Sequence, residues 1–491
     1  MRDIIFTFFN YFVFFYTSML AIFFVTFAFL SFISLKRRKD YYVESYMRKT
    51  IKESPYTPGI SVIAPAFNEE KTIIDNVNSM LALEYPLFEV VIVNDGSTDS
   101  TLEKMTEYYE LVEVPYAYIE RIKTRPFRRL LKSSNPKYSR LIVVDKENGG
   151  TKADASNAGI NVSSYPYFIC TDVDCILEKY ALYRCISPII SSDKQVIAVS
   201  GTMLMANGCV VKDGQIIDVR TPRTPIPLFQ NLEYMRSYLI GKMGWSAING
   251  MPNVSGGFGL FDRSVAIAAG GYDGTSFAED MDLITRMVGY MCDFSRPYKI
   301  VQIPDTCCWT EGPPNLAMLY RQRTRWARGL FQTLNIHRKM IFKKTYKQMG
   351  LLTLPYMFVF EFLAPIIELV GLIVFIYLAF TGAVNWNTAW MIYLTIYTFC
   401  QFLSIVVITY DYYVGMLYKR GYEYLWIIIA SILEPIFYHP IITFCSLRGY
   451  LSYLTNRDFK WKNMERKGFK QKEESADGTD ITAMKPEPAT I

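Results

Sequence analysis

The sequence predicts an α/β domain with a mostly parallel sheet, flanked on both sides by transmembrane helices. Three observations predict this arrangement. An apolar run without charged residues lies near the start, and three more apolar stretches lie between residues 351 and 447. Between them, from about residue 55 to 345, short β-branched runs alternate with helical segments, which is typical of βαβ units.

The composition narrows the class of protein. The 491 residues are 51% hydrophobic and 15% aromatic, which excludes a disordered chain, a collagen-like repeat and a small disulfide scaffold. The net charge of +6 forms no long basic stripe, so we expect no nucleic-acid partner. Nine cysteines without paired spacing and only two histidines offer no zinc-binding pattern. We therefore expect a reduced, cytosolic setting for the soluble part.

The first element is a transmembrane helix within residues 1–40. No charged residue occurs from Ile4 to Leu35, and a helix needs only about 20 residues to cross a bilayer. A signal peptide would have a shorter apolar region and a cleavage site, and a buried core helix is rarely this long. The basic cluster Lys36–Lys39 follows the run. By the positive-inside rule the N-terminus lies outside and the middle domain in the cytoplasm, as in a multi-pass protein of the plasma (inner) membrane.

The central domain contributes the sheet. Four β-branched runs predict strands, at Ile60–Ala64, Phe88–Val93, Leu141–Val144 and Tyr167–Cys170. Helices are expected between the first of them, at Thr72–Leu83 and Ser100–Tyr109. Ligands of such sheets bind outside the carboxyl ends of the strands, so the polar residues that follow each strand are the candidates for a site.

Three acids follow these strands: Asp95 after one, and Asp172 and Asp174 after another. Two carboxylates at i and i+2 point the same way and repel each other unless a cation lies between them. Hard oxygen ligands suit Mg²⁺ or Mn²⁺, and Mg²⁺ usually binds one or two carboxylates together with substrate phosphates. The motif therefore indicates a nucleotide diphosphate, although a solvated Asp turn explains it equally well.

Three further segments carry candidate residues. Lys152, after a Gly pair, supplies a positive charge near a phosphate. Glu279 and Asp280, the two candidate catalytic residues, open a predicted helix, where acids are also favoured for purely structural reasons. Arg325 and Trp326 lie on a basic helix, where Arg binds phosphate and Trp stacks on a sugar ring. The same helix fits an interfacial anchor beside the membrane, and the two interpretations are compatible.

Beyond the domain, the apolar stretches are Leu351–Ala383, Thr388–Tyr410 and Leu425–Leu447. The tail at 448–491 is basic at first and then polar, as in a disordered cytoplasmic tail. Three crossings from the cytoplasm would leave this basic segment outside, so one stretch does not cross simply. The first and third stretches are interrupted by Pro and charged or polar residues: Pro355, Glu361 and Pro365, and Glu434, Pro435, His439 and Pro440. The third is a candidate for a bent or re-entrant helix, and the number of crossings stays open.

Taken in order, the motifs resemble those of family 2 glycosyltransferases. They are Pro65–Glu70, Val93–Asp99, Thr171–Asp174, Gly270–Asp273, Ala278–Asp280 and Gln322-x-x-Arg325-Trp326. The last motif, with membrane helices around the domain, is similar to the processive branch, which makes poly-N-acetylglucosamine, hyaluronan and cellulose. The excursion at 210–227 departs from the family, as does the lack of a PilZ-like c-di-GMP-binding signature. A single N-terminal span stands where some relatives have two.

The resemblance implies a GT-A fold, a UDP-sugar donor and inversion at the anomeric carbon. It also implies the role of each residue. The uridine contacts are Glu69 and Asp95, the nucleotide contact is Asp172, the metal ligand is Asp174, the general base is Asp280, the acceptor contacts are Gln322 and Trp326, and the diphosphate contact is Arg325.

The implied function is synthesis of an extracellular polysaccharide, with UDP-GlcNAc as the preferred donor and UDP-Glc next. The expected partners are the donor, a growing glycan or lipid-linked acceptor, the lipid bilayer and an accessory membrane subunit. Two alternatives stay open: a single-addition transferase acting on a lipid-linked acceptor, and a non-catalytic subunit of a polysaccharide channel.

Overall fold

The computed structural model describes residues 2–41, 44–115, 117–173, 175–212 and 214–455. Asp174 and the expected disordered part of the tail lie outside the described residues.

The centre of the domain is the parallel sheet that the sequence predicts. β1 (Ile60–Ala66) pairs in parallel with both β2 (Phe88–Asp95) and β6 (Tyr167–Thr171), and β2 pairs in parallel with β5 (Leu141–Lys146). These four strands are the four β-branched runs of the sequence, so the prediction is confirmed. Their carboxyl ends meet at one edge of the sheet.

Further strands extend this centre on both sides into a ten-stranded sheet of order β3-β4-β5-β2-β1-β6-β11-β8-β12-β7. β12 pairs in parallel with β8, while β3–β4, β4–β5, β6–β11, β11–β8 and β12–β7 are antiparallel. A separate hairpin of β9 and β10 forms part of the excursion at 210–227. The bounds of the added strands are β3 (Leu111–Glu113), β4 (Phe127–Ser133), β7 (Ile176–Leu177), β8 (Gln195–Met205), β9 (Val210–Lys212), β10 (Gln215–Asp218), β11 (Phe258–Asp262) and β12 (Tyr298–Thr310).

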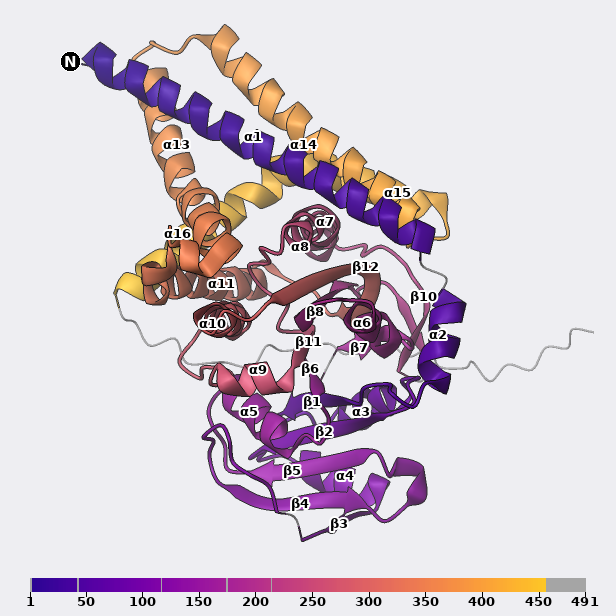
Figure 1. The fold of residues 1–491 in the computed structure, drawn as a ribbon. Helices are drawn as coiled ribbons and strands as arrows, with labels where there is room; N and C mark the ends of the chain where they lie inside the picture. The colour runs from indigo at the N-terminus through magenta and orange to yellow at the C-terminus, as the bar shows by residue number, and fades with distance from the viewer. Residues whose placement is uncertain (1, 42–43, 116, 174, 213, 456–491) are drawn as a thin grey trace, which may run out of the picture.

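Helices cover both faces of the sheet (Figure 1). Successive residues of a strand point to opposite faces, and the core divides accordingly. Val90 and Ile92 pack in one hydrophobic cluster and Val91 and Val93 in the other. The helices of the domain are α2 (Glu44–Glu53), α3 (Ile73–Leu81), α4 (Thr101–Tyr109), α5 (Lys152–Val162), α6 (Ala181–Ile190), α7 (Pro225–Arg236), α8 (Met243–Ala247), α9 (Arg263–Ala268), α10 (Glu279–Asp293) and α11 (Leu316–Ile336).

Four segments are long and apolar enough to cross a membrane: Tyr11–Arg37, Met349–Phe380, Trp386–Val414 and Gly421–Leu454. They comprise α1 (Arg2–Tyr41), the broken helix ending in α13 (Ala364–Phe380), α14 (Trp386–Val414), and α15 (Gly421–Leu433) with α16 (His439–Leu454). The breaks are π-helical turns at η5 (Met349–Thr353), η6 (Met357–Phe362) and η7 (Glu434–Tyr438), with the short α12 (Leu354–Tyr356) between the first two.

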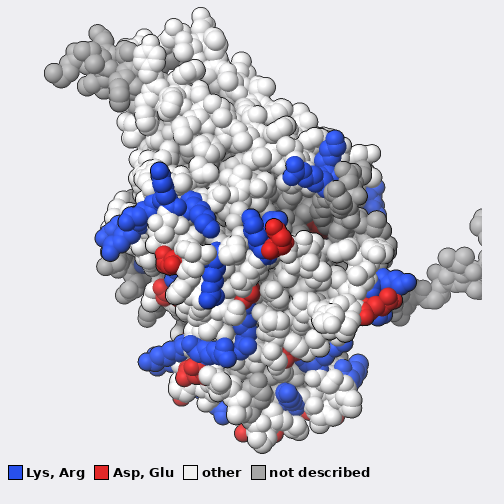
Figure 2. Space-filling model, viewed as in Figure 1, with Lys and Arg blue, Asp and Glu red and all other residues white. Residues whose placement is uncertain are grey.

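These four segments do not all run in the same direction. α1, α13 and α14 rise away from the domain, whereas α15 and α16 pass beside it (Figure 1). On the face shown in Figure 2 the rising helices are almost free of charged side chains, while Lys and Arg gather over the domain below them. The sequence prediction that residues 425–447 form a bent helix agrees with the π-turn η7 at Glu434–Tyr438.

The segment from α15 to α16 contacts the domain along its whole length. At its start Glu423 binds Arg223 at 3.0 Å, and in the middle Glu434 binds Arg236 at 2.8 Å. Near its end the Tyr453 hydroxyl accepts a hydrogen bond from Asn335 at 3.1 Å. The segment has 34 residues, which as a helix is about 50 Å long. A helix that rises from the domain would contact it only at one end, so this segment follows the surface of the domain.

Candidate active site

Hydrogen bonds join the loop after β1, which carries Glu69, to the loop that follows Asp95 at the end of β2. The backbone N–H of Glu69 donates to Thr101 Oγ1 at 2.8 Å, and Thr98 N–H donates to Asn68 Oδ1 at 2.8 Å. Asn68 has a φ of 57°, in the left-handed region that Asn tolerates better than most residues. The side chain of Asn68 thus joins the loop that carries Glu69 to the loop that follows Asp95.

Asp95, the last residue of β2, is held by a buried lysine that the sequence analysis did not single out. Lys146 Nζ lies 2.7 Å from Asp95 Oδ1 and 2.6 Å from Asp154 Oδ2, and the lysine side chain is fully buried. The Gly149 N–H donates to the same Asp95 oxygen at 3.0 Å. Asp95 therefore fixes the start of the glycine loop before α5. The position of Lys146 in the sequence could have identified it, because Lys146 ends a strand just as Asp95 does.

Lys152 and Asp172 form an ion pair at the carboxyl end of β6. Lys152 Nζ lies 2.6 Å from Asp172 Oδ1 and donates to the Gly256 carbonyl at 2.7 Å. Burial alone would lower the pKa of Lys152. The nearby carboxylate of Asp172 is the largest of the opposing effects, which together raise the pKa of Lys152 above its ordinary value. The lysine thus keeps its charge beside a carboxylate whose side chain is 38% exposed.

Asp280 lies on the other side of the same glycine. The Gly256 N–H donates to Asp280 Oδ2 at 3.1 Å, and the Met281 N–H donates to Oδ1 at 2.9 Å. Each carboxylate oxygen therefore has a fixed partner. The peptide groups of Gly256 connect Lys152, through the carbonyl, with Asp280, through the N–H.

Glu279 shares this buried environment. Burial and the charge of Asp280 raise the pKa of Glu279, while Arg325 and Lys152 act in the opposite direction. Asp280, Arg325 and Lys152 thus lie within electrostatic reach of Glu279, and Lys152 in turn pairs with Asp172.

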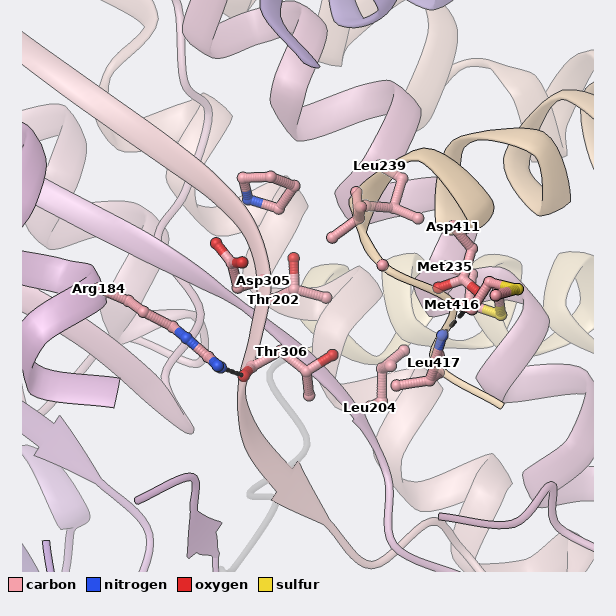
Figure 3. Close-up of a pocket in the computed structure, with 13 residues that line it drawn as sticks. Arg184, Thr202, Leu204, Met235, Leu239, Asp305, Thr306, Asp411, Met416 and Leu417 are labelled. Atoms are coloured by element: carbon pink, nitrogen blue, oxygen red, sulfur yellow. Dashed lines mark hydrogen bonds between the residues drawn. The ribbon is translucent and has the colours of Figure 1, made fainter. Parts of the chain in front are cut away.

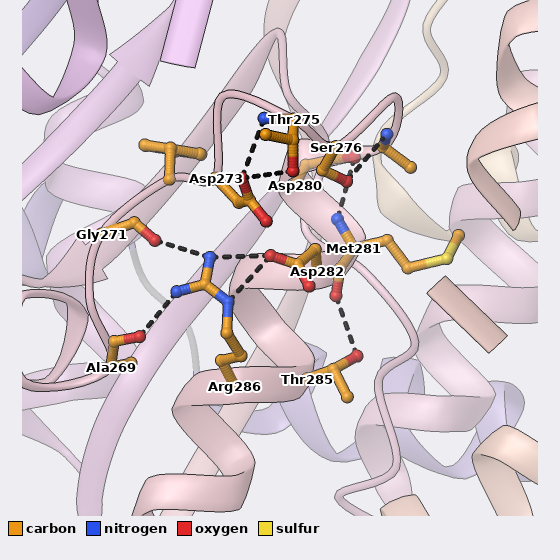
Figure 4. A network of polar contacts seen from close by, with 12 residues as sticks. Ala269, Gly271, Asp273, Thr275, Ser276, Asp280, Met281, Asp282, Thr285 and Arg286 are labelled. Carbon is orange, nitrogen blue, oxygen red and sulfur yellow. Dashed lines mark hydrogen bonds and ion pairs between the residues drawn. The ribbon is translucent and has the colours of Figure 1, made fainter. Parts of the chain in front are cut away.

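The start of α10 is secured by a polar network that includes the predicted Gly270–Asp273 motif (Figure 4). Arg286 binds Asp282 at 2.7 Å and donates to the carbonyls of Ala269 and Gly271, both at 2.6 Å. His337 contacts the other Asp282 oxygen at 2.8 Å. This network ties the glycine turn to the first turn of the helix, and so positions Asp280.

Within the same turn Asp273 accepts from both the N–H and the hydroxyl of Thr275, each at 2.8 Å. These contacts are local, so Asp273 acts as a turn residue in this loop.

α11 carries the Gln322-x-x-Arg325-Trp326 motif and packs directly on the loop before α10. A Cβ placed on Gly329 would lie 2.6 Å from the Ala278 Cβ, so only glycine permits this approach. Gln322 accepts a hydrogen bond from Gln230 at 3.2 Å. The helix is therefore both beside the candidate base and in contact with α7.

Trp326 has a partner that the sequence analysis missed. The guanidinium of Arg323 lies 4.5 Å from the centre of the Trp326 ring system. Arg323 also binds both carboxylate oxygens of Glu233, at 2.6 and 2.5 Å, and donates to the Tyr438 hydroxyl at 2.9 Å. One face of Trp326 is thus covered by a fixed cation, which links α11 to α7 and to η7.

A separate cavity of about 150 Å³ lies between β8, β12 and the end of α14 (Figure 3). Its polar lining includes Arg184, Asp305 and Asp411. None of the predicted site residues lines it.

Comparison with known families decides the class of this site. The family model "Glycosyl transferase family 2" matches residues 61–208, and the model "Glycosyl transferase family group 2" matches residues 223–444. The chain belongs to the family 2 glycosyltransferases. Together the two matches contain every predicted site residue. The predicted fold class, an α/β GT-A domain flanked by membrane helices, is confirmed, and the apolar helices make the chain a membrane protein.

Curated relatives carry the name poly-beta-1,6-N-acetyl-D-glucosamine synthase. The protein from Staphylococcus aureus (strain COL) is 29% identical over 278 residues, which is 56% of this chain and 55% of that protein. The protein from Staphylococcus epidermidis is 28% identical over 282 residues, 57% of each. The chain thus spans about half the length of the curated relatives it matches.

Among solved structures, the mannosyltransferase PcManGT from Pyrobaculum calidifontis, in complex with GDP-Man and Mn²⁺, aligns with a TM-score of 0.47 and 16% identity. The alignment covers 90% of this chain and 99% of that one.

Proposed function

We propose that this family 2 glycosyltransferase inverts the anomeric carbon of a UDP-sugar and adds the sugar to a growing glycan at the membrane, repeatedly, to build an extracellular polysaccharide. UDP-GlcNAc is the first candidate donor and UDP-Glc the second. The names of the curated relatives and the Gln322-x-x-Arg325-Trp326 motif support this proposal.

The observation that carries the proposal is the connection through Gly256. Lys152 and Asp172 lie at the carbonyl side of this glycine, and Asp280 accepts from its N–H. A donor-side cation and acid therefore lie next to a fixed carboxylate. Single-displacement inversion needs one general base and a stabilised leaving group, and this arrangement supplies groups for both.

In the proposed reaction Asp280 takes the proton from the acceptor hydroxyl. The oxygen of that hydroxyl forms a bond to the anomeric carbon, and the bond from this carbon to the diphosphate oxygen breaks. UDP leaves with the electron pair. Lys152 and Arg325 bring positive charge to the diphosphate, while the N–H groups of Gly256 and Met281 orient the base.

The acids also fit a divalent cation, Mg²⁺ or Mn²⁺. Asp172 offers a hard oxygen on a partly exposed side chain, and Asp174, outside the described residues, is the second proposed ligand. Within the described ranges no group of three potential ligands occurs, but Mg²⁺ needs only one or two carboxylates beside substrate phosphates. When bound, such an ion neutralises charge on the leaving diphosphate.

The membrane topology we propose has three crossings: α1, α13 and α14. α15 and α16 then lie along the cytoplasmic interface, in contact with the domain. Two crossings after the domain return the chain to the side of the domain. The basic cluster Lys36–Lys39 and the basic residues after 448 are then both cytoplasmic, as the positive-inside rule requires.

A donor screen tests the proposed activity. Purified full-length protein in lipid nanodiscs is given each UDP-sugar in turn with Mn²⁺, and UDP release is measured. We expect release with UDP-GlcNAc above that with UDP-Glc, and none in the absence of a divalent cation. Absence of release with every UDP-sugar, in protein that binds UDP, would contradict the proposal and favour a non-catalytic subunit.

A further inference from the structure

Lys242 is a buried lysine outside the motifs of the sequence. It ends η2 (Ser237–Lys242), a π-helical turn that separates α7 from α8. The residue is 8% exposed, and its ammonium lies 4.6 Å from the centre of the Tyr238 ring. Within the described part of the chain its ammonium has no hydrogen bond or ion pair. π-Helical turns inside helices are frequent at functional sites.

A chain of contacts links Lys242 to the candidate base. Tyr238, whose ring the ammonium contacts, forms a hydrogen bond with Ser255, and the N–H of the next residue, Gly256, donates to Asp280. Burial lowers the pKa of Lys242 to about 8, and Asp280 is the charged group that acts against this shift. Asp280 also raises the pKa of Tyr238, although burial is the main cause there. Asp280 therefore acts electrostatically on two residues of the same π-helical turn.

Lys242 and Lys152, the donor-side lysine, interact with different carboxylates. Asp172 and Glu279 act on Lys152, whereas among the described residues Asp280 is the carboxylate that acts on Lys242. Gly256 lies between Lys152 and Asp280, because its carbonyl binds Lys152 and its N–H binds Asp280. An ammonium near the base is suited to the sugar that gives up a proton.

The Tyr238 ring is the one contact that the described residues give this ammonium. A buried cation without a hydrogen bond or an ion pair costs free energy, so the fold gains little from a lysine at this position. A ligand oxygen that reaches the ammonium supplies the missing hydrogen bond.

We propose that Lys242 is an acceptor-binding residue, whose ammonium donates a hydrogen bond to an oxygen of the terminal acceptor sugar beside the hydroxyl that Asp280 deprotonates. This inference rests on the proposed function. The lysine keeps its proton throughout: the transferred proton goes from the acceptor hydroxyl to Asp280, and Lys242 holds the acceptor in place.

The test compares Lys242→Met with Lys347→Met. Lys347 is an exposed lysine that also lies over a tyrosine ring, 5.7 Å from the centre of Tyr298, so it is a matched control away from the site. The full-length variants in nanodiscs are assayed for sugar transfer to a short oligosaccharide over a range of acceptor concentrations. UDP affinity is measured by calorimetry and stability by thermal unfolding.

We expect Lys242→Met to lower kcat/KM for the acceptor by about 10- to 100-fold, as the loss of a hydrogen bond to a charged group predicts. The UDP affinity stays within about twofold, and Tm does not fall, because an unpaired buried charge has been removed. Lys242→Arg should retain more acceptor-dependent transfer than Lys242→Met, and Lys347→Met should match wild type.

Acceptor kcat/KM within about twofold of wild type in Lys242→Met would overturn the inference. So would a matching loss of UDP affinity, or a fall in Tm, since each assigns the lysine to a different role. Failure of the proposed function is distinguishable, because then the wild-type protein itself would transfer no sugar.

Discussion

Asp280→Asn is the substitution that most sharply separates chemistry from folding. Asn keeps the size of the side chain but replaces one carboxylate oxygen by an amide NH₂ group. Asp280 accepts hydrogen bonds from the N–H groups of Gly256, at 3.1 Å, and Met281, at 2.9 Å. In the Asn variant one of these N–H groups faces the amide NH₂, which is itself a donor. Loss of that hydrogen bond costs about 0.5–1.5 kcal/mol of stability. Loss of a general base costs about 10²–10⁴-fold in rate, or about 3–5.5 kcal/mol in the transition state.

The assay measures UDP release and UDP affinity in the same preparation. We expect transfer to fall by at least about 100-fold while UDP affinity stays near wild type. The matched control is Asp273→Asn, the same chemical change a few residues earlier, at a carboxylate that accepts from Thr275 in its own turn. It should lose little activity. Turnover of Asp280→Asn within about threefold of wild type would refute the assignment of the base.

Three further predictions concern the metal, the acceptor and the topology. Asp172→Ala and Asp174→Ala should each weaken UDP binding in calorimetry, and Asp174→Ala should also remove its dependence on Mn²⁺; metal dependence that survives would speak against the site. Trp326→Ala should reduce polymer yield several-fold more than UDP affinity, and Trp326→Phe should shorten the product, whereas tolerance of Phe would indicate only a membrane anchor. For topology, an introduced cysteine at Ser139 or Thr455 should be labelled only in permeabilised cells and one at Ala383 in intact cells; labelling of Thr455→Cys in intact cells would mean that the α15–α16 segment crosses.

The elements that the sequence predicted well are those with a local signal. The runs around Val62, Val91, Val143 and Ile169 are buried on both faces of the sheet, so each stretch is continuously apolar and recognisable without its neighbours. The site acids were found for a similar reason, because Asp95 and Asp172 follow such runs directly.

The residues that the sequence analysis missed depend on contacts between distant segments. Lys146 and Lys242 have the same side chain as exposed lysines. The fold shows that Lys146 pairs with Asp95 and Asp154, while Lys242 is buried against a tyrosine ring with no ion pair among the described residues. Arg323 meets Glu233, 90 residues earlier, and no local periodicity encodes that pairing.

The number of membrane crossings stayed open in the sequence for another reason. The α15–α16 segment is apolar enough to cross, with a mean hydropathy of 1.7 in its most apolar window. In the sequence, a charged residue such as Glu434 indicates only that the apolar stretch is interrupted. In the structure Glu434 pairs with Arg236 of the domain. Composition alone cannot separate a helix that spans the bilayer from one that lies between the bilayer and a protein surface.

If this chain polymerises sugar from a UDP donor, as proposed, its labelled product must be long. Purified wild-type protein in nanodiscs is incubated with radiolabelled UDP-GlcNAc and Mn²⁺, with Asp280→Asn as the blank, and the product is separated by size and by extraction into organic solvent. We expect a long, water-soluble polymer from the wild-type protein and none from the variant. A single labelled sugar on an extractable lipid, or no labelled product with any UDP-sugar, would contradict the proposal.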